Sequence, residues 1–162
     1  AWEVAYGVGI SKELKLDRWV AVQNRWNLLD GLDSPELEQA AEFLGIGIIP
    51  YTPLASGILT GKYTRGQEPE AGTRFADLAA IRGRLTDEKL ARAERVKVWA
   101  EERGHTAAEA AIAWLLAHPV VSSVIAGARK PEQLAANIAA ADWKLSEVER
   151  DELTALVGEP VS

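Results

Sequence analysis

The chain has 162 residues, a formal net charge of −6 and no cysteine. The lack of cysteine excludes a disulfide scaffold and a cysteine-based zinc site, and two histidines are too few for a histidine-rich centre, so no metal site is predicted. The 24 acidic residues outnumber the 18 basic ones, which argues against nucleic acid as a partner because phosphate binding needs a basic surface. No apolar run approaches the ~18 residues of a membrane span.

The hydrophobic pattern predicts helices that alternate with short apolar strands. The strands are expected at 19–22, 46–49 and 120–125. The helices are expected at 2–16, 34–44, 86–104, 106–118, 131–141 and 146–157. This alternation favours parallel strands in an α/β layer architecture. Such a short parallel sheet would leave faces and edges uncovered, so the chain is expected to form part of a larger sheet or barrel.

Capping residues predict several of the helix starts. Ser34 stands where an N-cap residue is expected. Thr106 with Glu109, and Ser146 with Glu149, have the spacing of capping boxes. These three helices should therefore begin sharply.

Two apparent phosphate-binding motifs fail on their context. Gly7 and Gly9 begin a GxGxxG pattern, but Lys12 replaces the third glycine and no strand precedes it. The stretch 57–62, GILTGK, is one residue short of a P-loop, and Tyr63 stands where a hydroxyl must hold magnesium. Neither motif is taken as a nucleotide site.

Neither histidine completes a Ser–His–Asp set. His105 lies beside a predicted helix cap and His118 directly precedes a proline. Both are expected to be solvated residues at helix ends, where a charged imidazole would favour the helix dipole.

The segment 47–63, GIIPYTPLASGILTGKY, is a strong candidate for a binding site. An apolar strand ends in Pro-Tyr and continues into a loop rich in proline and glycine, and α/β proteins bind ligands at the carboxyl ends of parallel strands. Gly57 allows a ligand close to the backbone, and the hydroxyls of Thr52 and Ser56 can bond phosphate oxygens. A rigid turn around a packed Tyr51 explains the same pattern equally well.

The segment 124–137, VIAGARKPEQLAAN, is a second candidate. Its strand ends at Gly127, and Arg129 and Lys130 precede the helix that Pro131 opens. A helix N-terminus attracts anions, and arginine offers a planar fork for phosphate. The alternative is a pair of solvated cations on a loop.

Four ordered blocks carry a family resemblance: AVQNRWNLLD (21–30), IPYTPLASGILTGKY (49–63), AAIAWLLAHP (110–119) and IAGARKPEQLAANIAA (125–140). Together they resemble the C-terminal part of the aldo-keto reductases, in the bacterial and potassium-channel β-subunit-like branches. The resemblance implies a (β/α)8 TIM barrel that binds NADP(H), with residues 1–162 forming one incomplete barrel domain that holds strands six to eight. The chain starts at Ala1 and contains no methionine, which fits a processed chain or a piece of a longer protein.

Matched position by position, the resemblance implies a cofactor site. Gln23 would hold the nicotinamide carboxamide, and Tyr51 would stack on the nicotinamide ring. Thr52, Pro53, Leu54, Ala55, Ser56 and Gly57 would cover the pyrophosphate, Lys62 and Arg74 would close over the cofactor, and Gly127, Arg129, Lys130, Gln133 and Asn137 would bind the adenosine and its 2′-phosphate. Ala136 stands where the family often has a glutamate that contacts the adenine amine, which weakens the expected hold on adenine.

The resemblance also implies what this stretch lacks. The family reduces aldehydes or ketones to alcohols with a tyrosine acid, a lysine, an aspartate and a histidine, and Tyr6 and Tyr63 lie in no matching motif. We therefore predict no catalytic residue within the chain, and we expect a cytoplasmic oxidoreductase fragment whose complete enzyme takes a small carbonyl substrate. The open sheet edges predict an N-terminal half-barrel or self-association as the partner.

Other interpretations remain open from the sequence. The chain could be a non-catalytic dinucleotide-binding or regulatory module, or an α/β fragment without retained binding. Residues 50–85 are too long for a plain connection and are expected to hold a functional loop, of which residues 64–85 could form a lid. Arg25 and Trp26 could line a pocket wall, and core packing explains Trp26 equally well.

Overall fold

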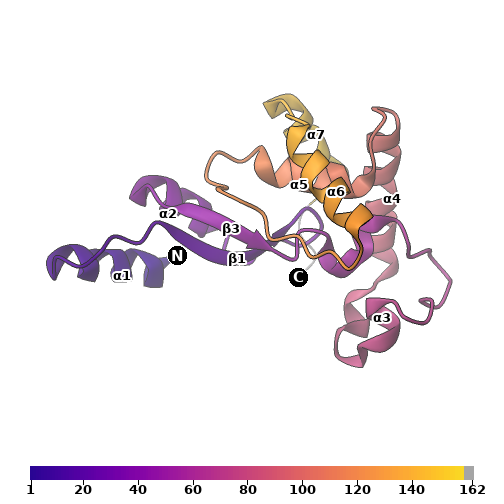
Figure 1. The fold of residues 1–162 in the computed structure, drawn as a ribbon, viewed down its shortest axis with the longest axis horizontal. Helices are drawn as coiled ribbons and strands as arrows, with labels where there is room; N and C mark the ends of the chain where they lie inside the picture. The colour runs from indigo at the N-terminus through magenta and orange to yellow at the C-terminus, as the bar shows by residue number, and fades with distance from the viewer. Residues whose placement is uncertain (159–162) are drawn as a thin grey trace.

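The computed structural model describes residues 1–158 and has an α/β architecture with one small open sheet (Figure 1). The α-helices are α1 (Trp2–Glu13), α2 (Glu36–Leu44), α3 (Arg74–Asp77), α4 (Asp87–Glu101), α5 (Ala107–Leu116), α6 (Pro131–Ala139) and α7 (Glu147–Val157). The strands are β1 (Ala21–Asn27), β2 (Gly31–Leu32) and β3 (Gly47–Tyr51), and the 3-10 helices are η1 (Ala55–Thr60), η2 (Ala79–Arg84) and η3 (Ala140–Asp142). None of the helices within 1–158 is both long and apolar enough to cross a membrane.

β1 is the central strand of a sheet ordered β2-β1-β3. β1 and β3 are parallel, with Gln23 opposite Ile49 and Arg25 opposite Tyr51, which confirms the parallel pairing predicted from the alternation of helices and strands. β2 pairs antiparallel to the last two residues of β1. This short hairpin was not predicted, because two residues carry no strand periodicity.

The third predicted strand runs beside β3 but is not continuous. Ile48 N donates to Val120 O (2.7 Å), and Ile48 O accepts from Ser122 N (3.0 Å). The next bond joins Ile125 N to Pro50 O (2.9 Å). Pro50 has no N–H to donate, so one hydrogen bond of the parallel ladder is missing. Beyond it the two segments pair with their register shifted by one residue. The prediction of a regular strand here is therefore corrected to a parallel segment with a bulge.

Two further predictions are corrected at element boundaries. The first strand was predicted at 19–22 and instead runs from Ala21 to Asn27, because pairing with β3 and β2 carries it through polar residues that have no apolar strand pattern. No side-chain hydrogen bond caps α2, since the hydroxyl of Ser34 donates to Glu36 Oε2 (3.4 Å). Both predicted capping boxes, at Thr106 and Ser146, are confirmed.

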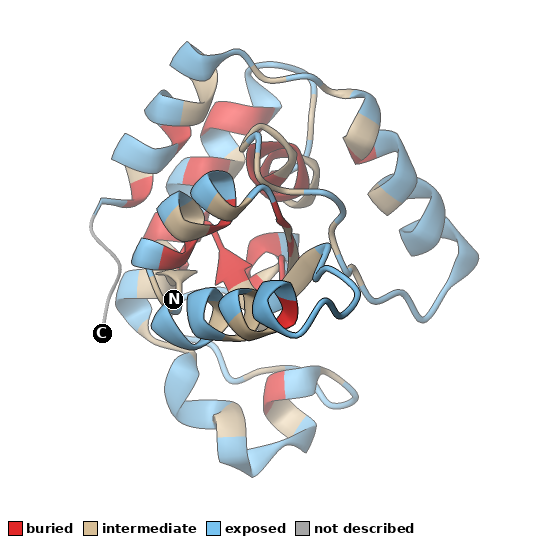
Figure 2. Ribbon diagram, turned by 90° about the vertical axis from the view of Figure 1, so that its left-hand side faces the viewer, coloured by how far each residue is buried: buried red, intermediate tan, exposed pale blue. Residues whose placement is uncertain are grey.

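Helices cover one face of the sheet and leave the other open. α2 packs against β3 and α5 against β1, and Ile48 and Pro50 are fully buried on that side. Figure 2 shows the buried residues gathered where the strands meet the helices. On the other face Gln23 is exposed and Tyr51 is 36% exposed. A sheet with one covered and one open face is what part of a (β/α)8 barrel would have.

Candidate functional site

The predicted binding segments converge at the carboxyl ends of neighbouring parallel strands. Arg25 pairs with Tyr51 across β1 and β3, and Tyr51 forms a parallel bridge to Ile125. The loop after β3 and the segment that follows Ile125 therefore leave the sheet side by side. This edge is where α/β proteins place their ligands.

Tyr51 ends β3 on the open face of the sheet, and Gln23 lies on the same face two residue pairs earlier. Both side chains are exposed. Thr52 Oγ1 donates to the Tyr51 carbonyl (2.7 Å) and fixes the turn that follows. An aromatic ring beside a free carboxamide can stack on and hydrogen-bond to a flat heterocyclic amide.

Several residues of the loop after Tyr51 have backbone dihedral angles in the left-handed region. Thr52, Ala55, Ser56 and Gly57 have φ values of 55°, 48°, 60° and 100°. Residues other than glycine rarely take such angles, and clusters of them are typical of functional sites. Backbone bonds close the turn, from Ala55 N to Thr52 O (3.1 Å) among others. Of the other predicted cover residues, Pro53 is buried and Leu54 half-buried.

The two cations expected to close over a cofactor are placed differently. Lys62 folds back against the loop, since a β-carbon at Gly57 would lie 3.2 Å from Lys62 Nζ. Arg74 begins α3, which lies away from the strand ends (Figure 1). The structure brings Lys62 to the loop but does not bring Arg74 there.

The start of α6 carries the second predicted segment. Arg129 and Lys130 have exposed side chains, but their backbone N–H groups both donate to Gln133 Oε1 (2.8 and 3.2 Å). Gln133 thus caps its own helix, an arrangement that the sequence analysis missed. Nothing lies within 4 Å of where a β-carbon of Gly127 would stand. The buried Nδ2 of Asn137 has no hydrogen-bond partner within the described chain, so a donor remains for a ligand.

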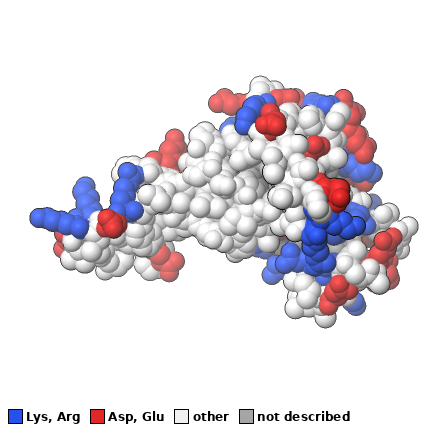
Figure 3. Space-filling view, in the orientation of Figure 1, with Lys and Arg blue, Asp and Glu red and all other residues white. Residues whose placement is uncertain are grey.

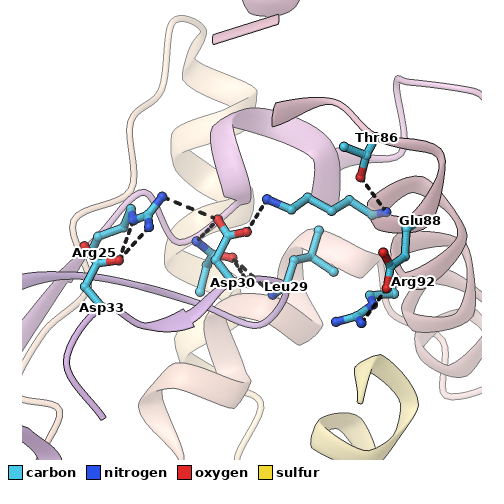
Figure 4. Close-up of polar contacts among 9 residues, drawn as sticks. Arg25, Leu29, Asp30, Asp33, Thr86, Glu88 and Arg92 are labelled. Carbon is cyan, nitrogen blue, oxygen red and sulfur yellow. Dashed lines mark hydrogen bonds and ion pairs between the residues drawn. The ribbon is translucent and has the colours of Figure 1, made fainter. Parts of the chain in front are cut away.

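A charged network beside this site was also missed by the sequence analysis. Arg25 Nε donates to Asp33 Oδ1 (2.8 Å), which raises the pKa of the guanidinium further. Asp30 pairs with Lys89 Nζ (2.5 Å) and accepts from Asn27 Nδ2 (3.2 Å), as Figure 4 shows. Burial alone would raise the pKa of Asp30, but the bonds from Lys89 and Asn27 outweigh it and hold that pKa below its usual value. The sequence signal that could have pointed to this network was the cluster of charged residues at and after the end of β1.

His118 is not the solvated helix-end residue that was predicted. Its ring lies between Trp26 and Trp114, with centroids 4.6 and 4.7 Å away. Its Nδ1 lies 2.9 Å from Oε1 of Glu38. Burial lowers the pKa of His118, and the nearby carboxylate offsets part of that shift. Packing against aromatic rings from β1 and α5 overrides the exposed position expected beside a proline.

The other candidate catalytic groups do not assemble. His105 remains partly exposed at its helix end, where its ring stacks on Trp143 (3.8 Å between centroids). Tyr6 is exposed on α1, and Tyr63 is buried edge-on against Phe75. Among residues 1–158, no three histidine, aspartate or glutamate side chains group as a metal site.

Comparison with known proteins gives the family. The model of the aldo/keto reductase family matches residues 2–157. The chain is 38% identical over 148 residues to a probable voltage-gated potassium channel subunit beta of Arabidopsis thaliana, covering 76% of this chain and 45% of that protein. It is 36% identical over 129 residues to the L-glyceraldehyde 3-phosphate reductase of Escherichia coli K12, covering 77% and 34%. It is 31% identical over 144 residues to the uncharacterized oxidoreductase YrpG of Bacillus subtilis, covering 89% and 42%.

The chain spans less than half the length of these relatives. The matched region nevertheless takes in all the elements described above, from α1 to α7. This chain therefore belongs to the aldo-keto reductase family.

Proposed function

We propose that this chain carries the NADP(H)-binding part of an aldo-keto reductase that reduces aldehydes or ketones to alcohols. The observation that carries the proposal is the convergence of Tyr51, the left-handed loop after it and the segment that follows Ile125 at one sheet edge. NADPH would supply a hydride there. A ring to stack on, a loop to follow a diphosphate and cations for a 2′-phosphate are the three parts such a ligand needs.

Each part of the site has a role in this proposal. Gln23 would bond the nicotinamide carboxamide, and Tyr51 would fix which face of the ring is presented. Arg129 and Lys130 would hold the 2′-phosphate with their side chains, since their N–H groups are taken by Gln133. These positions fit the ligand because the Tyr51 ring is open to solvent and the space at Gly127 is free.

The proton for the reduction would come from outside this chain. Carbonyl reduction needs a donor beside the reacting oxygen as well as a hydride. Tyr6 is exposed on α1 and Tyr63 is buried edge-on against Phe75, and we assign neither phenol to this role. We propose that another part of the complete protein, or a partner chain, supplies the acid and closes the open face.

A second candidate is a dinucleotide-binding regulatory module. The relatives whose names describe potassium channel beta subunits favour it. The two candidates separate when the chain is assayed together with a complementing half-barrel: turnover of an aldehyde supports the reductase, and cofactor binding without turnover supports the module.

Titration of NADPH and NADH, followed by tryptophan fluorescence, tests the cofactor assignment. Six tryptophans provide the signal. We expect saturable quenching by NADPH and a weaker response to NADH. Arg129→Ala should remove most of the preference, about tenfold for one charge-assisted contact. Lys97→Ala, a change of the same charge on the far helix α4, should keep it. Equal responses to both cofactors would contradict the assignment of the 2′-phosphate, and no response to either would contradict the cofactor site.

A further inference from the structure

One edge of β1 is free along the first part of the strand. β3 pairs with the opposite edge, and β2 covers the free one only beside Trp26 and Asn27. Within residues 1–158, no strand therefore pairs with 21–24 on this side. An unpaired edge offers a row of N–H and C=O groups to another strand.

The hydrogen bonds at the two ends of this stretch show which backbone groups point outward. The carbonyl of Val20 accepts from the first residue of β3, whereas the carbonyl of Arg25 accepts from the residue that follows β2. Successive residues of a strand direct their backbone groups to opposite edges. Ala21 and Gln23 therefore direct their N–H and C=O groups to the free edge.

The free edge lacks the features that commonly prevent strands from pairing. The stretch 19–24, WVAVQN, contains no charged residue and no proline, and the register with β3 runs from Ala21 to Arg25 without a bulge. Trp19 and Val20, at its start, are 44% and 77% exposed. On the face drawn in Figure 3, the region over the sheet is uncharged as well. Two copies can meet here without local repulsion, although each carries a net charge of −6.

The chain also exposes more surface than a compact monomer of its size. Its accessible surface is 9744 Å², whereas a folded monomer of 17.6 kDa exposes about 7,900 Å². The excess is about 1,800 Å² per chain. An obligate homodimer buries roughly 1,000–2,500 Å² per copy, so the excess is of the size that contact with a second copy covers.

We infer that two copies of this chain pair antiparallel along the free edge of β1, around a two-fold axis at Val22. In this register Ala21 of one copy lies opposite Gln23 of the other, so each outward N–H meets an outward C=O. The sheet then continues as β3-β1-β1-β3, with the two open faces on the same side. No cofactor takes part, so the inference does not rest on the proposed function.

The neighbouring registers satisfy fewer groups. A two-fold axis at Gln23 would place Ala21 opposite Arg25, whose carbonyl already accepts from Asp33 N. An axis at Ala21 would place Gln23 opposite Trp19, which precedes the strand. The register centred on Val22 is the one in which both outward residues pair with each other.

Sedimentation equilibrium of the intact chain tests the association. We expect a mass twice the 17.6 kDa of one chain. Ala21→Pro removes an N–H that points away from β3, and Val20→Lys adds a cation at an exposed position of the edge, so either variant should sediment as a monomer. Val20→Lys guards against a proline variant that fails to fold. Val148→Lys makes the same change at an exposed valine on α7 and should keep the dimer.

The possible outcomes separate this inference from the proposed function. A wild-type chain that is monomeric, or that pairs only with a complementing half-barrel, overturns the dimer and leaves the cofactor assignment untouched. A dimer that Val20→Lys leaves intact uses another surface and overturns the inference as well. Failure of NADPH to bind a dimer that the edge variants dissociate overturns the cofactor assignment alone.

A single introduced cysteine tests the register, because the chain has none of its own. The two copies of Val22 would face each other as a non-hydrogen-bonded pair, with α-carbons about 4.5 Å apart, within reach of a disulfide. Val22→Cys should therefore be captured as a covalent dimer under mild oxidation, whereas Val148→Cys at the same concentration should not. Equal cross-linking of the two variants would overturn the pairing at Val22.

Discussion

Nδ1 of His118 lies 2.9 Å from Oε1 of Glu38, and the two residues are 80 positions apart in the chain. An ionised carboxylate only accepts hydrogen bonds, so the contact places the imidazole proton on Nδ1. The opposite nitrogen, Nε2, is buried and has no partner in the part of the chain that the structure describes. A second proton would therefore charge the ring in a site that offers it nothing to bond.

This arrangement predicts that stability falls as the pH drops below about 6.5. Burial lowers the pKa of His118 from its usual 6.5, so the unfolded chain takes up a proton before the folded one does. The free energy of unfolding therefore increases as the pH rises toward about 6.5. As the pH falls below that value, the unfolded chain is protonated first and the contribution of neutral His118 to stability is progressively lost. Urea unfolding between about pH 7.5 and pH 5 measures the slope.

Two variants identify the group responsible. His118→Gln should flatten the dependence on pH, whereas His105→Gln should keep it because it leaves the Trp26 site intact. Asp30 and Glu149, whose pKa values are lowered from 3.8 and 4.5, stabilise the fold above those values and lose that effect only in more acidic solution. A wild-type curve that stays flat down to pH ~5 would contradict the prediction.

The contact of Gly47 with Ser122 sets the spacing between β3 and the segment beside it. A β-carbon on Gly47 would overlap Ser122 Oγ and lie 3.0 Å from its Cβ. Gly47→Ala should therefore force the two apart and destabilise the chain by about 1–3 kcal/mol. Ser122→Gly in the same molecule should recover part of the loss in thermal unfolding. Additive effects of the two changes would show that the contact does not matter.

Local signals in the sequence predicted much of the fold because they act over a few residues. The boxes at Thr106 and Ser146 are confirmed for that reason. Pro50 visibly lacks an N–H in the sequence, so a missing hydrogen bond at this residue could be foreseen. The register with the segment around Val120 could not, because that segment lies far along the chain and no local pattern specifies which residues pair. Hairpin β2 and the burial of His118 depend on tertiary packing alone.

In the candidate site, too, local sequence signals could be used for prediction, whereas contacts made only by tertiary packing could not. The segments around Tyr51 and Gly127 could be found because each follows an apolar strand, and parallel strands bring their ends together. The pairing of Asp30 with Lys89 joins a turn to a helix across the long loop, and no spacing rule predicts it. Gln133 was predicted to bind the adenosine end of the cofactor, which stays a prediction; the structure adds that its Oε1 accepts from the N–H groups of Arg129 and Lys130 at the start of α6.

Two glycines in α1 provide a matched test of packing against helix propensity. A β-carbon added at Gly9 would meet nothing within 4 Å, whereas one on Gly7 would lie 2.7 Å from the Trp19 ring. Gly9→Ala should stabilise the chain by about 0.5–1 kcal/mol, because alanine costs less backbone entropy in a helix. Gly7→Ala should lose that gain by displacing Trp19. Equal changes in melting temperature for the two variants would contradict the placement of Trp19 against α1.

The cap at Ser146 should matter for more than α7 itself. Ser146 Oγ accepts from Glu149 N (3.3 Å), and the Glu149 carboxylate bonds back to Ser146 N (2.8 Å). Ser146→Ala should cost about 1 kcal/mol in urea unfolding, with Ser146→Asp losing little because aspartate also caps. Since Thr154 on the same helix accepts from Trp114 Nε1 (3.0 Å), fraying of α7 should also change the tryptophan fluorescence. A loss of stability equal for the Ala and Asp variants would mean that the capping bond does not hold the helix start.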